Sequence, residues 1–127
     1  MKLDDSQPIY RQLADQIRQQ IIEGHLAEEE QVMSTTQFAQ TLRINPATVA
    51  KAFAELTQEG LLYKQRGIGM FVAPGAQEQL LAVRREQYFD AVLRPALDEG
   101  RQIGITGASV QEYVTSFLSR TEHGEEV

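Results

Sequence analysis

The stretch from Asn45 to Lys51 holds the residues whose types and spacing most readily suggest chemistry. Asparagine is a favoured N-cap and proline a favoured first residue, so Asn45 and Pro46 predict that a helix begins here. A helix start offers backbone amides and the positive end of the helix dipole to phosphate, and the Thr48 hydroxyl can add a hydrogen bond. The pattern predicts a helix whose N-terminus binds an anion.

The apolar residues of this segment predict which face of the helix is buried. They recur at helical spacing up to about Glu59 and are Val49, Ala52, Phe53 and Leu56. The opposite face then carries Ala47, Thr48, Ala50, Lys51 and Ala54. Because alanine side chains are small, such a face can approach base edges and thymine methyl groups closely, with Lys51 as its only long donor.

Two further helices are predicted before this one. Ile9, Leu13, Ile17 and Ile21 form an apolar stripe on a helix from about 8 to 23, which Gly24 ends. The residues from Ser34 to Gln37 form a capping box that opens a short helix with Phe38, Ala39 and Leu42 on its apolar side. Only Arg43 and Ile44 separate that helix from the cap at Asn45, so we expect two short helices joined by a tight turn.

A glycine-containing hairpin is predicted to follow. Residues 61–64 and 70–73 are rich in aliphatic and aromatic side chains and predict two strands, with a loop from Gln65 to Gly69 between them. Gly67 and Gly69 would let the backbone lie against phosphates or in a minor groove, flanked by Lys64 and Arg66. Taken singly, these residues suit a plain turn and solvated charges, and the cap at Asn45 suits any helix.

The distribution of charge allows the middle of the chain to face DNA. The net charge is −6, which by itself argues against a polyanionic ligand. Between residues 36 and 75, however, four basic residues accompany only two acidic ones, whereas from residue 76 onward five arginines accompany nine acidic residues. We therefore expect the middle segment to contact phosphate and the tail not to.

The run from Pro74 to Ala76 marks a predicted domain boundary, with one domain over residues 1–75 and a helical region over residues 76–127. Pro95 should kink or break a tail helix near Leu93 or Arg94, and a capping box from Ser109 to Glu112 should open the last helix. The tail helices carry more apolar side chains than they can hide against each other, which predicts a homodimer interface. Its expected residues are Leu80, Leu81, Tyr88, Phe89, Val92, Leu93, Leu97, Tyr113 and Phe117.

Other function classes find little support. The chain has no cysteine, and its two histidines, His25 after a helix end and His123 in the tail, form no cluster or triad, so we expect no enzyme, metal site or cofactor. The acidic run Glu28 to Glu30 is most simply a solvated turn. No apolar run could cross a membrane, and we expect a cytoplasmic protein. Any small-molecule effector would bind between two chains, in a niche near Tyr88 or Tyr113, because so short a tail leaves little room for a cavity.

The order of these motifs resembles the GntR family of bacterial regulators, and the short helical tail resembles its YtrA-type subfamily. The matching segments are residues 8–10, Gly24 with Leu26, Ser34 with Phe38 and Ala39, residues 45–49, 59–61 and 66–72. The family usually has an arginine at the position of Thr36, where it commonly contacts DNA. The resemblance therefore implies DNA binding in which Thr36 stands where the family has its DNA-contacting arginine, and Arg43 in part substitutes for that arginine.

We therefore predict an α+β fold, an N-terminal winged helix-turn-helix domain followed by a short all-α dimerisation region. Its expected function is that of a sequence-specific repressor that binds a palindromic operator in double-stranded DNA as a homodimer. The expected DNA-binding residues are Ser34, Thr36, Arg43, Asn45, Ala47, Thr48, Ala50, Lys51, Lys64, Arg66, Gly67 and Gly69. The alternative is a winged-helix module that binds a protein partner through the same face, which the acidic total and Thr36 would allow.

Overall fold

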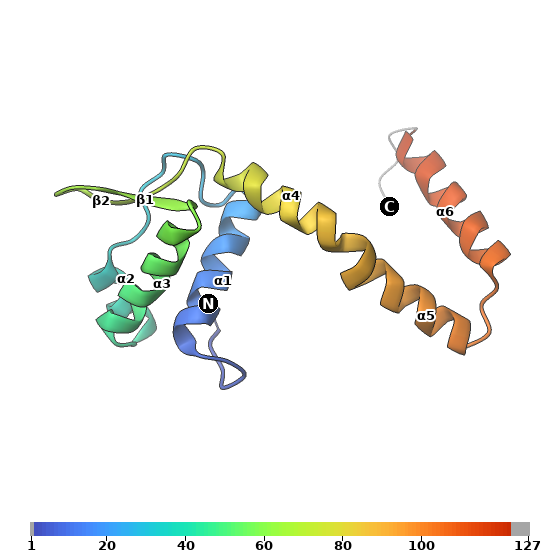
Figure 1. The fold of residues 1–127 in the computed structure, drawn as a ribbon, viewed down its shortest axis with the longest axis horizontal. Coiled ribbons are helices and arrows are strands. Elements are labelled where there is room, and N and C mark those ends of the chain that lie inside the picture. The colour runs from blue at the N-terminus through green and yellow to red at the C-terminus, as the bar shows by residue number, and fades with distance from the viewer. Residues whose placement is uncertain (1, 123–127) are drawn as a thin grey trace. The chain divides into compact units, whose positions relative to one another are not determined.

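The computed structural model describes residues 2–122, and the chain divides into two compact units, Met1–Arg84 and Arg85–Val127 (Figure 1). The division lies between Arg84 and Arg85, whereas the sequence places a boundary between Gly75 and Ala76. The difference arises because the first turns of α4 (Ala76–Tyr88) pack on the first unit. Ala76 is fully buried there, and Leu80 is partly buried against the same core.

The first unit opens with three helices, α1 (Ile9–Ile22), α2 (Thr35–Leu42) and α3 (Pro46–Gln58). The capping box predicted for α2 is confirmed, since Ser34 Oγ accepts from the Gln37 amide and Gln37 Oε1 accepts from the Ser34 amide. Asn45 caps α3, with Pro46 in its first turn. Both helices therefore begin where the sequence predicts, and Arg43, at a φ of 55°, makes the tight turn between them.

An antiparallel hairpin follows, with strands β1 (Leu62–Gln65) and β2 (Gly69–Val72). Both strands lie one residue from the predicted ranges. The hairpin also has a neighbour that the sequence did not indicate, because the Glu29 amide donates to the Val72 carbonyl and the Val32 amide to the Met70 carbonyl. The acidic loop before α2 is thus an edge of the wing, and its backbone supports β2.

One apolar core joins these elements. Its buried members are Leu13, Ala14, Ile17, Ile21, Val32, Phe38, Ala39, Val49, Ala52, Phe53, Leu56, Leu61, Leu62, Val72 and Ala76. They include every α3 residue predicted to be buried. Phe38 meets Phe53 edge to face, with ring centroids 5.7 Å apart, which packs α2 onto α3. The exposed side of α3 is therefore held in place by contacts on its other side.

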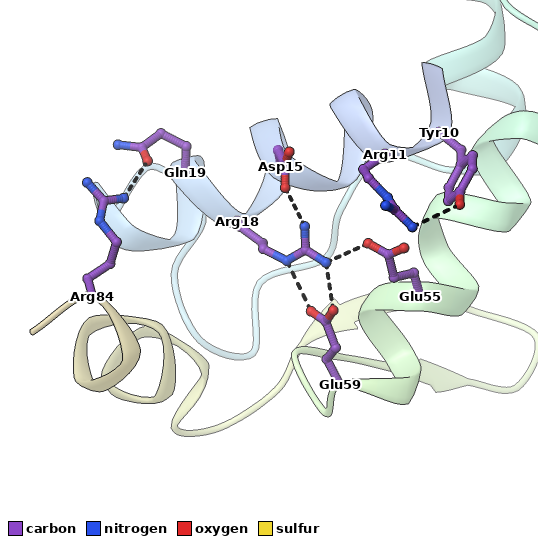
Figure 2. Close-up of polar contacts among 8 residues, drawn as sticks. All are labelled: Tyr10, Arg11, Asp15, Arg18, Gln19, Glu55, Glu59 and Arg84. Carbon is purple, nitrogen blue, oxygen red and sulfur yellow. Dashed lines mark hydrogen bonds and ion pairs between the residues drawn. The ribbon is translucent and has the colours of Figure 1, made fainter. Parts of the chain in front are cut away.

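An ion cluster centred on Arg18 ties α1 to α3 (Figure 2). The Arg18 guanidinium lies 2.6 Å from Glu55, 2.7 Å from Glu59 and 2.6 Å from Asp15. Burial is the largest single effect on the pKa of Arg18 and would lower it. The hydrogen bonds and charge interactions with Glu59 and Glu55 outweigh that effect, so the pKa of Arg18 is raised above its usual range and the side chain stays charged.

The second unit contains the end of α4, a π-helical turn η1 (Phe89–Leu93), α5 (Arg94–Gln102) and α6 (Gly107–Glu122). The helix predicted to kink or break near Leu93 instead passes through the π-helical turn, and Pro95 lies in the first turn of α5. The cap of α6 is Thr106, whose Oγ1 accepts from the Ser109 amide, so the capping box expected at Ser109 is wrong. Between residues 85 and 120 no side chain is buried.

Candidate nucleic-acid interface

The exposed face of α3 has the composition that the sequence predicts. Ala47, Ala50 and Ala54 are exposed, as is Lys51, and Thr48 is half-buried beside them. Three alanines make this face smooth, since no long side chain other than Lys51 rises from it. A smooth face on a firmly packed helix is what insertion into a DNA groove requires.

The N-terminus of α3 differs from the expectation in one respect. Pro46 has no amide hydrogen, the Ala47 amide donates to Asn45 Oδ1, and the Thr48 amide donates to the Asn45 carbonyl. The Val49 amide also donates to the Asn45 carbonyl, at 3.3 Å. The first-turn amides are therefore already paired within the chain, whereas the sequence led us to expect free ones. What the helix start still offers an anion is the dipole and the Thr48 hydroxyl.

A hollow separates α3 from the wing. Its lining residues come from the start of α2, from α3 and from both strands: Ser34, Thr35, Thr36, Ala50, Phe53, Lys64, Gly69 and Met70. Five predicted DNA-binding residues thus meet at one place, namely Ser34, Thr36, Ala50, Lys64 and Gly69. Ser34 Oγ accepts a hydrogen bond from the Gln37 amide, and its hydroxyl hydrogen remains available to donate to an outside partner.

A second hollow lies on the other side of α3, against the start of α1. Ile9, Tyr10, Ala47, Thr48 and Lys51 line it. It brings together three predicted residues, Ala47, Thr48 and Lys51. It also contains Tyr10, which sequence reasoning missed as a functional residue, although its place beside Pro8 and Ile9 was noted as part of the family pattern. The Lys51 ammonium lies 4.1 Å from the centroid of the Tyr10 ring.

The tip of the wing carries the remaining predicted residues of the hairpin. Arg66 is exposed, and Gly67 has a φ of 78°, which a side chain would strain. Ile68 is 61% exposed, and its carbonyl accepts a hydrogen bond from the Gln31 side chain at 3.0 Å. The wing tip thus presents an exposed arginine. The loop before α2 holds the turn that carries it through the hydrogen bond from Gln31.

Four of the predicted residues line neither hollow: Arg43, Asn45, Arg66 and Gly67. Asn45 uses its side-chain oxygen to cap α3. Arg43 is exposed in the turn between α2 and α3. These residues lie outside both hollows, near the ends of helices and in the wing turn. A ligand that contacts them together with the residues of the hollows must therefore be longer than either hollow. Duplex DNA is such a ligand.

The two acidic residues of the α3 segment are drawn into the ion cluster with Arg18. Glu55 and Glu59 are the only acidic residues between positions 36 and 75. Both are paired with Arg18, which is 19% exposed. Lys51, Lys64 and Arg66 are exposed on the other parts of α3 and the wing. The exposed side of α3 and the wing therefore carries lysine and arginine side chains, while the two glutamates of this segment are held against α1 by Arg18.

A family model described as bacterial regulatory proteins of the gntR family matches residues 9–72, from the first residue of α1 to the last of β2. The chain belongs to the gntR family. It is also YtrA-like, as the sequence predicted. The HTH-type transcriptional repressor YtrA of Bacillus subtilis is 23% identical to it over 120 residues, which cover 94% of this chain and 92% of YtrA.

Solved structures agree with this gntR assignment. The crystal structure of a transcriptional regulator from Oenococcus oeni matches with a TM-score of 0.75 and 27% identity over 93% of this chain and 97% of that one. AraR(DBD), crystallised in complex with operator ORE1, matches with a TM-score of 0.52 and 27% identity over 57% of this chain and 89% of that one. The first unit is thus a winged helix-turn-helix of a transcription regulator family.

Two other kinds of feature are missing from the described part of the chain. Within residues 2–122, no three histidine, cysteine or carboxylate side chains are placed to hold a metal ion. Among the same residues, no helix has the length and apolar character needed to cross a bilayer. His123, named above among the histidines, lies outside the described residues.

The second unit exposes much of its apolar surface. Its large exposed apolar residues are Tyr88, Phe89, Val92, Leu97, Ile103, Ile105, Tyr113, Val114, Phe117 and Leu118. Six of the residues predicted for a dimer interface are among them, and Leu93 is half-buried. A shallow hollow along α6 is lined by Ala108, Gln111, Glu112, Thr115, Ser116, Ser119 and Arg120. Neither Tyr88 nor Tyr113 lines it, so it lends no support to an effector niche beside these tyrosines.

Proposed function

We propose that this gntR-family chain represses transcription by occupying an operator in duplex DNA as a homodimer. The observation that carries the proposal is the exposed alanine face of α3 with Lys51, flanked by Lys64 on the wing. In this arrangement α3 enters the major groove, and the wing reaches phosphates or the adjacent minor groove. Bound there, the protein would block access of polymerase to a promoter in the bacterial cytoplasm.

The family relation supports the choice of DNA over a protein partner. AraR(DBD), which shares the fold of the first unit, was crystallised on an operator. The pairing of Glu55 and Glu59 with Arg18 holds these carboxylates against α1, and Lys51, Lys64 and Arg66 are exposed on α3 and the wing, where they suit phosphate. YtrA, which matches over nearly the whole chain, is a repressor, and this favours repression as the outcome of operator binding.

The proposed dimer forms through the second unit. In the single chain, no residue between 85 and 120 is buried, although large apolar side chains are frequent there. So many exposed large apolar side chains in one unit are typical of an interaction surface. The proposed interface residues are Leu81, Tyr88, Phe89, Val92, Leu93, Leu97, Tyr113 and Phe117. Leu80 is left out because its side chain already packs against the core of the first unit.

Two winged units joined in this way would read two half-sites. One recognition helix contacts only a few base pairs, and two-fold symmetry doubles the site. Linking the units also raises affinity, since the second unit binds at the high effective concentration that the first creates. A palindromic operator is the DNA counterpart of such a dimer.

The test is retention of fragments of the organism's own genome on the full-length protein, followed by fluorescence anisotropy on the retained duplexes. We expect one inverted-repeat sequence to be enriched. If about six phosphates are contacted by the dimer, its affinity should fall about a thousandfold between 50 and 200 mM salt. Failure to retain any duplex, or affinity that is independent of salt, would contradict the proposal and favour the protein-binding alternative.

A further inference from the structure

Tyr10 and Lys51 lie far apart in the sequence, on α1 and α3, but meet beside the proposed DNA-facing surface. Tyr10 lies in the first turn of α1, and Lys51 lies in the middle of α3. The Lys51 Nζ atom is 4.1 Å from the centroid of the Tyr10 ring, within the range of a cation–π interaction. Both residues line the hollow that also contains Ala47 and Thr48.

The two partners differ in how firmly they are held. Tyr10 is partly buried and packs against the apolar core, and its hydroxyl oxygen accepts a hydrogen bond from Arg11 at 3.2 Å. Lys51 is exposed. A lysine side chain of this kind otherwise samples many rotamers, and the freedom is lost when it binds a partner. A fixed aromatic ring beneath the ammonium therefore restricts Lys51 before any DNA arrives.

The ring leaves the ammonium able to bind. A lysine ammonium carries three N–H donors, and a ring below it engages only the side that faces the ring. The other donors remain available on the same side of α3 as Ala47 and Thr48. The Lys51 charge can thus contact the Tyr10 ring and an acceptor on DNA at the same time.

We propose that Tyr10 is a positioning residue for DNA recognition: its ring holds the Lys51 ammonium at the exposed face of α3, where it donates to an acceptor atom of the duplex. The inference rests on the proposed function. The acceptor is either a base edge in the major groove or a phosphate oxygen, and these two share the hydrogen-bond chemistry that an ammonium satisfies. The ring acts through Lys51 and needs no contact of its own with DNA.

The test is a double-mutant cycle of Tyr10→Leu and Lys51→Met in the full-length protein, measured by anisotropy on a duplex that the unsubstituted protein retains. A cation–π contact at an exposed site corresponds to about a two- to fivefold change in affinity. We expect Tyr10→Leu to weaken binding by that factor, Tyr10→Phe to restore most of it, and Tyr10→Leu to have no further effect once Lys51→Met is present. If Tyr10→Leu left affinity unchanged or increased it, or weakened binding equally in both backgrounds, the inference would be overturned.

Lys64 supplies the matched control. The substitution Lys64→Met removes the same charge from the same surface. Lys64, however, lines the hollow on the wing side of α3, and Tyr10 does not line that hollow. The effects of Tyr10→Leu and Lys64→Met should therefore multiply, whereas those of Tyr10→Leu and Lys51→Met should not. Coupling of equal size in both cycles would indicate a general disturbance of the domain and would overturn the inference.

A measurement without DNA separates this inference from the proposed function. In the free protein, the Tyr10 ring current should shift the NMR signals of the Lys51 side-chain protons upfield, and the shift should disappear in Tyr10→Leu but persist in Tyr10→Phe. Signals that are unchanged by Tyr10→Leu would overturn the contact itself. Failure of the unsubstituted protein to bind any duplex would instead overturn the proposed function, whatever the NMR result. Substituting each base pair of the operator in turn identifies the acceptor. If Lys51 contacts a base edge, the affinity of the protein falls when that one base pair is changed, whereas a phosphate contact gives no such position.

Discussion

Gln31 occupies the space that a side chain at Gly69 would need. A Cβ added at Gly69 would lie 2.6 Å from Gln31 Nε2, and Gly69 has a φ of +147°, where a side chain is strained. The same Gln31 nitrogen donates to the Ile68 carbonyl at 3.0 Å. The loop before α2 therefore braces the wing tip through the end of the Gln31 side chain, and the positive φ favours glycine at position 69.

Gly69→Ala should destabilise the fold and weaken DNA binding. Backbone strain costs about 1–3 kcal/mol, and shifting the exposed Gln31 side chain away from its hydrogen bond to Ile68 adds less than about 1 kcal/mol. Gly67→Ala is the matched control, because Gly67 has a φ of +78° but no atom within 4 Å of the added Cβ. Urea denaturation should show the larger loss for Gly69→Ala, and equal losses would contradict the role given to Gln31.

Arg18→Met should lower the free energy of unfolding by about 1–3 kcal/mol, because it leaves Glu55 and Glu59 close together without a cation. Arg94→Met is the control. Arg94 pairs with Asp90 at 2.8 Å, but both side chains are more than two-thirds exposed, at 71% and 79%. An exposed pair of this kind contributes less than about 1 kcal/mol. Equal losses in thermal or urea unfolding would show that the Arg18 cluster is not what holds α1 against α3.

Arg66→Ala should weaken binding to all duplexes alike, because Arg66 lies at the exposed tip of the wing and has a phosphate as its expected partner. Removing one phosphate contact per protomer should make the slope of log affinity against log salt shallower by about 2 for the dimer. Titrations of the variant at several salt concentrations measure this slope. A slope equal to that of the unsubstituted protein would remove Arg66 from the interface.

Val92→Glu should convert the protein to a monomer. Val92 is 53% exposed in the single chain and lies within η1, in the middle of the proposed dimer surface. A carboxylate there would be buried without a partner, at a cost of several kcal/mol to the dimer. Sedimentation of the full-length chain should show a dimer for the unsubstituted protein and a monomer for the variant. The control is Ala82→Glu, at an exposed position outside the proposed surface, and this variant should remain dimeric. A monomeric unsubstituted protein would contradict the proposed dimer.

Much of the first unit could be predicted from the sequence because its elements begin with strong local signals. Ser34 and Asn45 cap their helices as expected, and the apolar period of α3 identifies its buried face. The pairing of the 29–32 backbone with β2 and the contact between Tyr10 and Lys51 could not be predicted, since both join residues far apart in the chain. At Asn45 the cap itself was predicted correctly, but its consequence was not, because pairing of the first-turn amides removes the donors expected for phosphate.

The second unit was harder to predict for a different reason. Thr106 and Ser109 can both cap a helix, and the sequence pattern alone favoured Ser109. In the structure Gly104 ends α5 at a φ of +85°, and the Ile105 amide donates to the Gly100 carbonyl at 2.8 Å. This early stop allows α6 to begin at Gly107, under the Thr106 cap. The start of α4 belongs to the core of the first unit, because Ala76 is buried there and Leu80 packs against it.

The central claim is that α3 and the wing bind duplex DNA. It is tested most directly by removing the same number of positive charges from this surface and, in a second variant, from the second unit. The triple variant Lys51→Ala, Lys64→Ala and Arg66→Ala removes three positive charges from the proposed interface. Arg94→Ala, Arg101→Ala and Arg120→Ala removes the same charge from the second unit. Measured by anisotropy on a retained operator at 100 mM salt, the first triple should weaken binding more than about a hundredfold and the second less than about fivefold. Equal losses from the two triples would contradict the account.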